Sequence, residues 1–296
     1  MDMAWTDTHD RAAFESAAGE FLYADPVSNT TALTLLADLR ERGDHAFGTE
    51  PPRFGVLADA DGTVASAFAH TPPFPLLLLG ALPLPQVASF VDVLLGGPRP
   101  VTWMIAGDDT AAAVAAAWHD RTGTVATVAE RQRLYRLDAL VPPDPMPEGA
   151  ARPAGPGDRE VLMRMLTDFE VSLGHLNVDP ARLAAANDLR IAHGLFTVWE
   201  TAGEVVSVAA NKPLAAGVAR VGPVYTPPEH RGRGYGGAVT AARTADAFAQ
   251  GADEVVLFTD LANPTSNSIY QRIGYVPLED RVMLAFPAPD GEVVPV

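Results

Sequence analysis

The stretch that decides the fold reads Gly222-Pro223-Val224-Tyr225-Thr226-Pro227-Pro228-Glu229-His230-Arg231-Gly232-Arg233-Gly234-Tyr235-Gly236-Gly237, and it joins a predicted strand to a predicted helix. Pro223 has no amide hydrogen for a sheet ladder, so we expect the strand to bulge or to separate from its neighbour there. The glycines that follow let the backbone approach a ligand closely. The first amides of the helix have no partner within it, and with Arg231 and Arg233 they favour a phosphate or diphosphate.

On both sides of this stretch, the residue pattern predicts a mixed α/β (α+β) fold. The predicted elements are helices at 159–173 and 180–191, strands at 195–200, 204–212 and 219–226, a helix at 235–250, a strand at 255–260, a helix at 264–273, and final strands within 275–286. The three consecutive strands are predicted to form an antiparallel meander, whereas a dinucleotide-binding unit needs a parallel pair. The stretch also lacks the Gly-Lys-Ser/Thr ending of a P-loop, which excludes both nucleotide-binding folds.

A similar order of elements is predicted for the N-terminal half, which indicates an internal duplication. Its predicted elements are helices at 12–20 and 30–41, strands at 53–58, 63–70 and 75–79, a helix at 85–95, a strand at 101–106, and a helix at 109–121. The segment 141–147 holds four prolines, which neither a helix nor a central strand accommodates. We therefore predict a first domain at 1–140, a Pro-rich linker at 141–150 and a second domain at 151–296.

Composition excludes several classes of function. The net charge of −16 over 296 residues opposes a nucleic-acid partner, because such proteins neutralise phosphates with Lys and Arg. The absence of cysteine excludes disulfides, thiolate metal sites and cysteine nucleophiles, and no metal site is predicted. We find no signal-peptide pattern and no stretch long enough to span a membrane, so we expect a cytoplasmic protein without a membrane partner. The acidity slightly favours a cationic substrate, and the oligomeric state stays open.

Two separated motifs resemble those of the GNAT acetyltransferases. Arg231-x-x-Gly234-x-Gly236 is similar to the acetyl-CoA signature of that family, and Asn263 followed by Tyr270-Gln271-Arg272-Ile273-Gly274-Tyr275 is similar to its closing helix. The resemblance covers roughly residues 151–286 and implies two tandem GNAT-like domains, each a mixed, mostly antiparallel sheet flanked by helices. In the first domain the corresponding loop, 81–86, has neither an arginine nor a glycine cradle, which indicates a degenerate domain without the motif.

The same resemblance implies roles for individual residues. Main-chain N–H groups near Val224–Thr226 are expected to hold the acetyl-pantetheine arm and the developing oxyanion. Tyr270 is expected at the departing thiolate; since a phenol of pKa ~10 protonates a thiolate of pKa ~8.5 only uphill, a hydrogen bond is its main expected role. The implied cofactor-binding residues are Val224, Tyr225, Thr226, Arg231, Gly232, Arg233, Gly234, Tyr235, Gly236, Gly237, Asn263, Ser266 and Tyr270.

The base that deprotonates the amine stays open among Glu170, His175, Glu200, Glu229 and His230. Glu170 is preferred because its helix borders the acceptor site in such folds, although a carboxylate on an amphipathic helix is more often part of a solvated face. Tyr270 also has a simpler interpretation, as a buried core tyrosine.

The resulting prediction is an acetyl-CoA-dependent N-acetyltransferase. The expected reaction transfers acetyl to a primary amine of a small molecule by direct attack in a ternary complex, with acetyl-CoA as co-substrate. The alternatives are a protein amino group as acceptor, and an acyl-CoA sensor without turnover.

Overall fold

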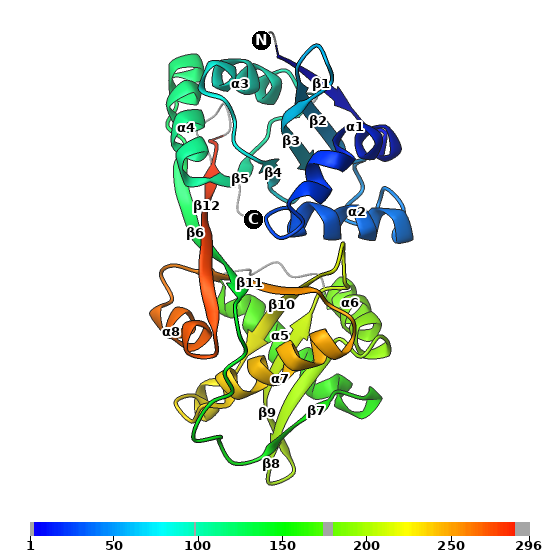
Figure 1. Ribbon diagram of the computed structural model, residues 1–296, viewed down its shortest axis with the longest axis vertical. Helices are drawn as coiled ribbons and strands as arrows, with labels where there is room; N and C mark the ends of the chain where they lie inside the picture. The colour runs from blue at the N-terminus through cyan, green and yellow to red at the C-terminus, as the bar shows by residue number, and fades with distance from the viewer. Residues whose placement is uncertain (1–2, 98, 174–179, 288–296) are drawn as a thin grey trace. The chain divides into compact units, whose positions relative to one another are not determined.

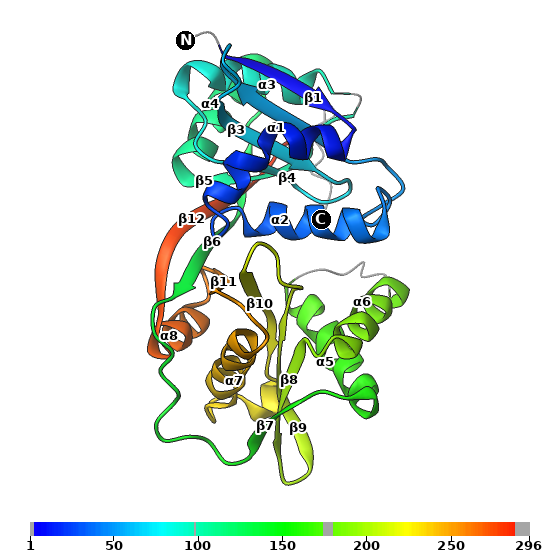
Figure 2. The ribbon, with the colours of Figure 1, turned by 45° about the vertical axis from the view of Figure 1, so that its right-hand side comes forward.

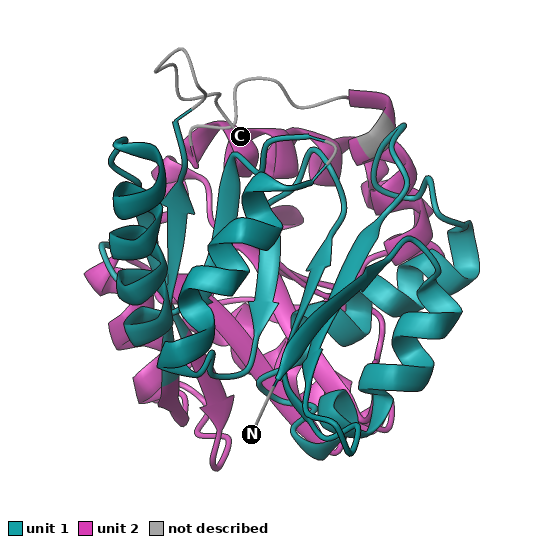
Figure 3. Ribbon diagram, turned by 90° about the horizontal axis from the view of Figure 1, so that it is seen from above, with its two compact units in different colours: residues 1–133, 260–262, 279–296 teal, residues 134–259, 263–278 magenta. Residues whose placement is uncertain are grey.

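The computed structural model describes residues 3–97, 99–173 and 180–287, which fall into two compact units (Figure 3). Unit 1 comprises residues 1–133, 260–262 and 279–296, and unit 2 comprises residues 134–259 and 263–278. Each unit therefore combines segments that are distant in sequence. The continuous domain ranges 1–140 and 151–296 stay a prediction, since residues 279–285 contribute to unit 1.

Unit 1 consists of a mixed sheet with helices packed against it (Figure 1). Its sheet has the order β1-β2-β3-β4-β5-β12, in which β4 and β5 are parallel and the other pairs are antiparallel. Its elements are β1 (Ala4–Thr8), α1 (Arg11–Ala24), α2 (Thr30–Arg42), β2 (Arg53–Ala58), β3 (Val64–His70), β4 (Leu76–Leu79), η1 (Leu84–Gln86), α3 (Val87–Leu95), β5 (Trp103–Gly107), α4 (Asp108–Thr122) and the first part of β6 (Thr127–Leu137). Phe68, Phe90 and Met104 lie in its core.

Unit 2 repeats this arrangement. Its sheet has the order β6-β11-β10-β9-β8-β7, in which β10 is parallel to β11 and the neighbouring pairs β7–β8, β8–β9 and β9–β10 are antiparallel. Its elements are β7 (Ala150–Pro153), η2 (Pro156–Asp158), α5 (Arg159–Ser172), α6 (Pro180–Ala192), β8 (Phe196–Thr201), β9 (Glu204–Asn211), β10 (Val218–Tyr225), η3 (Pro228–His230), α7 (Tyr235–Ala249), β11 (Glu254–Asp260), α8 (Pro264–Arg272) and the first part of β12 (Tyr275–Ala285). The order of strand, two helices, three strands, helix, strand and helix thus occurs twice, which supports the predicted duplication.

The predicted antiparallel meander and the predicted helices of unit 2 are confirmed. The prediction of several final strands was wrong, because 275–285 forms one strand, β12, which continues through Pro277 and Asp280 without a turn. Three strands were not predicted. β1 and β7 are short, and β6 carries four charged or amide side chains in succession at 130–133, which hides its strand pattern.

The two faces of the unit 2 sheet are covered by different helices (Figure 2). Val198, Val208 and Ala210 pack with α5 residues, including Leu162 and Leu166, on one face. On the other face, Trp199 and Ala209 pack with Tyr235, Ala238 and Val239 of α7. Tyr270 of α8 shares a core cluster with Ala247 of α7, so α8 lies on the α7 face. This separation gives the sheet two sides on which different ligands can bind.

His70, at the end of β3, should make the stability of unit 1 depend on pH. Burial, and then the positive charge of Arg53, lower the pKa of His70 to about 4. In the unfolded chain the His70 side chain is protonated below about pH 6.5, whereas in the folded chain it stays neutral down to about pH 4. The stabilisation present above pH 6.5 is therefore lost as the pH falls through about 4. The loss amounts to about 3 kcal/mol at most, since one pKa unit corresponds to about 1.4 kcal/mol.

We expect His70→Gln to flatten this dependence, as measured by urea unfolding at a series of pH values. Above pH 7 the free energy of unfolding of the variant should differ from that of the unmodified protein by a constant amount. An unchanged slope between about pH 6.5 and pH 4 would show that His70 is not the titrating group.

Candidate functional site

The backbone opens at the centre of the unit 2 sheet. β10 and β11 pair over Val218–Val221 and Glu254–Leu257, and within the described residues the pairing of β10 with β11 goes no further. The pairing of β10 with β9 shifts register between Val221 and Val224, on either side of Gly222-Pro223. The bulge expected at Pro223 is confirmed. The last residues of β10 are thus free of β11, which leaves a gap between two parallel strands.

The loop after β10 is braced by its own side chains. Arg231 donates from Nε to the carbonyl oxygen of Thr226 at 2.9 Å, and its guanidinium lies 5.8 Å from the centre of the Tyr225 ring. The hydroxyl groups of Ser207 and Thr226 are 2.8 Å apart. Arg231 therefore holds the loop in shape. Arg233 is exposed as well, and among the described residues it makes no such hydrogen bond.

The loop ends at the N-terminus of α7. Gly234 is its N-cap in the left-handed region, with φ of 85°. The first helical bond runs from the amide of Ala238 to the carbonyl of Gly234 at 3.1 Å, so the amides of Tyr235, Gly236 and Gly237 have no partner within the helix. This end of the helix is suited to an anion.

Glycines at this helix end let neighbouring segments approach its backbone closely. A Cβ added to Gly236 would lie 3.4 Å from Thr226 Oγ1, and one added to Gly237 would lie 3.5 Å from Ile269 Cγ2 and 3.7 Å from Pro143 Cγ. The Pro-rich segment therefore packs close to the glycine loop instead of running free. The side chain of Tyr235 is buried in the core, so Tyr235 can contact a ligand through its backbone alone.

The N-terminus of α8 holds the second set of expected residues. Asn263 caps the helix by accepting from the amide of Ser266 at 3.0 Å. Tyr270 is 9% exposed and lies edge-on to Tyr275, with ring centres 6.3 Å apart. Burial raises the pKa of Tyr270 to about 12, and a hydrogen bond with Ser266 opposes part of that rise. Tyr270 is therefore a protonated, buried phenol at neutral pH, suited to donating a hydrogen bond and poorly suited to losing a proton.

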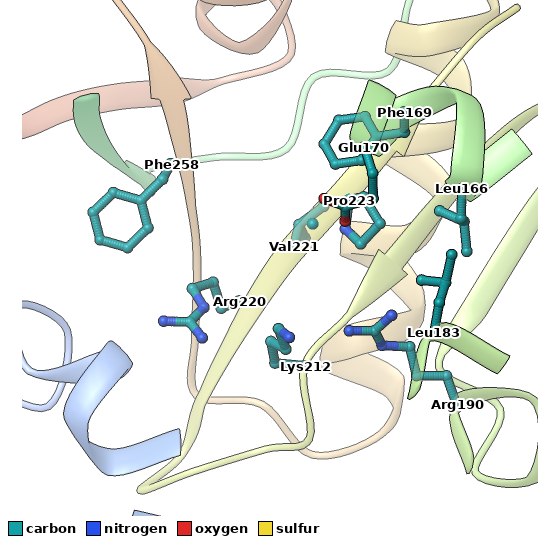
Figure 4. Close-up of a pocket in the computed structure, with 11 residues that line it drawn as sticks. Leu166, Phe169, Glu170, Leu183, Arg190, Lys212, Arg220, Val221, Pro223 and Phe258 are labelled. Carbon is teal, nitrogen blue, oxygen red and sulfur yellow. The ribbon is translucent and has the colours of Figure 1, made fainter. Parts of the chain in front are cut away.

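A cavity of about 280 Å³ lies at the backbone gap (Figure 4). Its wall includes the backbone at Gly222 and Pro223, Phe258 from β11, and apolar side chains from α5 and α6. The lining residues are Leu166, Phe169, Glu170, Leu183, Arg190, Lys212, Arg220, Val221, Gly222, Pro223 and Phe258. A small apolar-walled cavity with a few polar groups is typical of a small-molecule site.

Of the candidate bases in the described part of the chain, Glu170 alone lines this cavity. Glu200 forms an ion pair with Arg152 at 2.7 Å on β8. His230 Nε2 lies 3.5 Å from a carboxylate oxygen of Glu204, and Glu229 is exposed in η3. His175 lies outside the described residues. The geometry therefore favours Glu170.

Three cationic residues of the cavity wall were not predicted, namely Arg190, Lys212 and Arg220. The sequence marks one of them, since Lys212 is the single lysine among the 21 Lys and Arg residues of the chain. No motif connects it to the other two, which come from α6 and β10.

Comparisons with known proteins agree with the motifs. Residues 162–275 match the model of the acetyltransferase (GNAT) family. A GCN5-related N-acetyltransferase from Sphaerobacter thermophilus is similar in structure, with a TM-score of 0.63 and 17% identity over 95% of this chain and 94% of its own. A GNAT-family acetyltransferase from Colwellia psychrerythraea gives a TM-score of 0.61 and 10% identity over 96% and 99%. No curated protein is significantly similar in sequence.

The structural similarity extends over both units. A third match, a GCN5-related N-acetyltransferase from Kribbella flavida, has a TM-score of 0.53 and 20% identity over 76% of this chain and 87% of its own. At these identities the matches establish the fold alone, and that fold covers nearly the whole chain. The prediction of two tandem GNAT-like domains is confirmed.

Among the described helices, none has the length and apolar character needed to cross a membrane.

Proposed function

We propose that this protein is an N-acetyltransferase that moves the acetyl group of acetyl-CoA to a primary amine of a small molecule, since residues 162–275 match the model of the acetyltransferase (GNAT) family. The observation that carries the proposal is the gap between β10 and β11 beyond Val221 and Leu257. The glycine loop and α8 border it on one face of the sheet, and the cavity containing Glu170 borders it on the other. A cavity of about 280 Å³ supports a small amine over a protein amino group.

The residues of the gap have complementary tasks in this proposal. The amides of Tyr235, Gly236 and Gly237, which have no partner within the helix, bind the phosphates of the coenzyme. Acetyl-CoA supplies the thioester carbon that the amine attacks. Amides in 224–226 donate to the acetyl oxygen as it gains charge. Glu170 takes the proton that the ammonium form of the acceptor must lose before its nitrogen can attack. As the nitrogen–carbon bond forms and the carbon–sulfur bond breaks, the second proton of that nitrogen passes to the departing thiolate of coenzyme A.

Tyr270→Phe is expected to lower kcat while leaving acetyl-CoA affinity nearly unchanged. The phenol donates a hydrogen bond to the sulfur as it becomes a thiolate, and a bond to a charged group is worth about 1.5–3 kcal/mol, or about tenfold to a hundredfold in rate. Turnover is measured by release of free thiol. Tyr275→Phe is the matched control, because Tyr275 is also buried and its hydroxyl bonds Thr244 at 2.7 Å. Equal losses in both variants would assign Tyr270 a structural role.

The function itself is tested by incubating the purified protein with acetyl-CoA and a panel of amines. Thiol release together with an N-acetylated product supports the proposal. Binding of acetyl-CoA without any turnover would instead indicate a sensor. Acetylation of peptides in preference to every small amine would indicate a protein acceptor.

A further inference from the structure

Building on the proposed function, we infer that the acceptor amine carries an anionic group, which Lys212, Arg190 and Arg220 bind in the cavity. The feature that leads to this inference is the charge of the cavity wall. Within the described part of the chain, four ionisable residues line it, of which three are cationic and one, Glu170, is acidic. The chain as a whole has 21 basic and 37 acidic residues, so the wall reverses the balance of the protein.

The cationic residues come from three different elements. Lys212 directly follows β9, and its amide donates to the carbonyl of Arg220 in β10 at 2.9 Å, which makes the two residues neighbours across the sheet. Arg190 lies on α6, where its Nη1 donates to Asn187 Oδ1 at 3.2 Å and its guanidinium lies 5.9 Å from the centre of the Phe196 ring. Two contacts thus hold Arg190 in place at the wall.

The acidic side chain and the three cationic side chains lie in different parts of the cavity. In Figure 4, Glu170 lies beside Pro223 near the backbone gap, and Lys212 lies between Arg220 and Arg190 away from it. An acceptor with an amine at one end and an anion at the other matches this arrangement. Its amine faces Glu170 and the gap, and its anionic end faces the three cationic side chains.

Local charge should outweigh the acidity of the whole protein. The field of exposed charges fades within about 8–10 Å at physiological ionic strength, whereas half-buried groups are screened less. Arg190, Lys212 and Arg220 are all half-buried. The cavity therefore disfavours polyamines and other acceptors with a second cation, contrary to the expectation from net charge, and favours carboxylated or phosphorylated amines.

Lys212 offers a test that does not require turnover. It is the single lysine of the chain, so an amine-reactive reagent modifies only Lys212 and the N-terminal amine, and peptide mapping separates the two. We expect β-alanine or phosphoethanolamine to protect Lys212 severalfold in the full-length protein. Propylamine and ethanolamine, the matching amines without the anionic group, consume the reagent equally but should not protect Lys212 when its labelling is expressed relative to that of the N-terminal amine. Failure of both anionic amines to protect Lys212, or equal protection by propylamine and ethanolamine, would overturn the inference. Comparing the protection given by β-alanine with that given by phosphoethanolamine shows whether the cavity prefers a carboxylate or a phosphate.

A substitution extends the test to the reaction. Lys212→Met should raise KM for the anionic amine about tenfold or more, as expected for a lost charged hydrogen bond, and should raise it far more than KM for an amine without an anionic group, while acetyl-CoA affinity stays the same. Lys212→Arg should restore part of the loss, which a merely structural role would not predict. If amines without an anionic group are acetylated as well as anionic ones, the inference fails while the proposed function stands. If no amine is acetylated at all, the proposed function fails, and the protection experiment still decides whether the cavity binds anions.

Discussion

Gly234→Val is expected to abolish measurable acetyl-CoA binding, with a loss of at least about a hundredfold in affinity, in a protein that stays folded. Gly234 has φ of 85°, a conformation that costs an L-residue about 1–2 kcal/mol and a β-branched one more. The backbone relieves that strain by rotating, which turns the amides of Tyr235, Gly236 and Gly237 away from a common anion. Because several charge-assisted hydrogen bonds share this one geometry, they are lost together. Calorimetric titration with acetyl-CoA measures the effect.

Gly251→Val is the matched control at the opposite end of the same helix. Gly251 has φ of 94°, and a Cβ added there meets no atom within 4 Å. The backbone strain is thus comparable, while the substitution lies away from the glycine loop. We expect wild-type affinity for acetyl-CoA in Gly251→Val. Wild-type affinity in Gly234→Val, or equal losses in both variants, would contradict the placement of the phosphates on these amides.

The backbone of the coenzyme side could be predicted because its determinants are local. Pro223 removes one amide from the ladder, and the register does shift beside it. The glycines before α7 need no distant partner to adopt their conformation, as the left-handed φ values of Gly232 and Gly234 illustrate. Side-chain roles were less predictable. Arg231 was expected at the phosphates, but it donates to the carbonyl of Thr226. A long side chain can bond a nearby backbone carbonyl as well as a ligand, and the residue pattern does not distinguish the two.

The acceptor side could not be predicted, because it is assembled from residues distant in sequence. Arg190, Lys212 and Arg220 meet through the register of β9 with β10 and the packing of α6, neither of which a local pattern specifies. β6 was missed for a related reason. Its polar run is compatible with a strand because Arg133 forms an ion pair with Asp280 of β12 at 2.6 Å, a partner 147 residues away.

Glu170→Gln is expected to lower kcat/KM by about a hundredfold or more, within the range of about 10² to 10⁴ typical of a lost general base. The amide keeps the size and the hydrogen-bonding capacity of the carboxylate but accepts no proton. Acetyl-CoA affinity should not change, because Glu170 lies on α5 and the phosphate-binding amides lie on α7, on opposite faces of the sheet. Thiol release at saturating acetyl-CoA measures the effect.

Asp168→Asn controls for the loss of a negative charge from α5. Asp168 is exposed two residues before Glu170 and does not line the cavity, so its substitution should leave kcat/KM within about twofold. A pH series separates a base from a residue that only orients the acceptor. An alkyl amine has a pKa of about 10, so the fraction that is already neutral rises steeply between about pH 7 and about pH 9. If Glu170 removes that proton, the defect of Glu170→Gln should shrink across this interval, whereas a defect that is constant with pH would leave Glu170 as a binding residue and require another base.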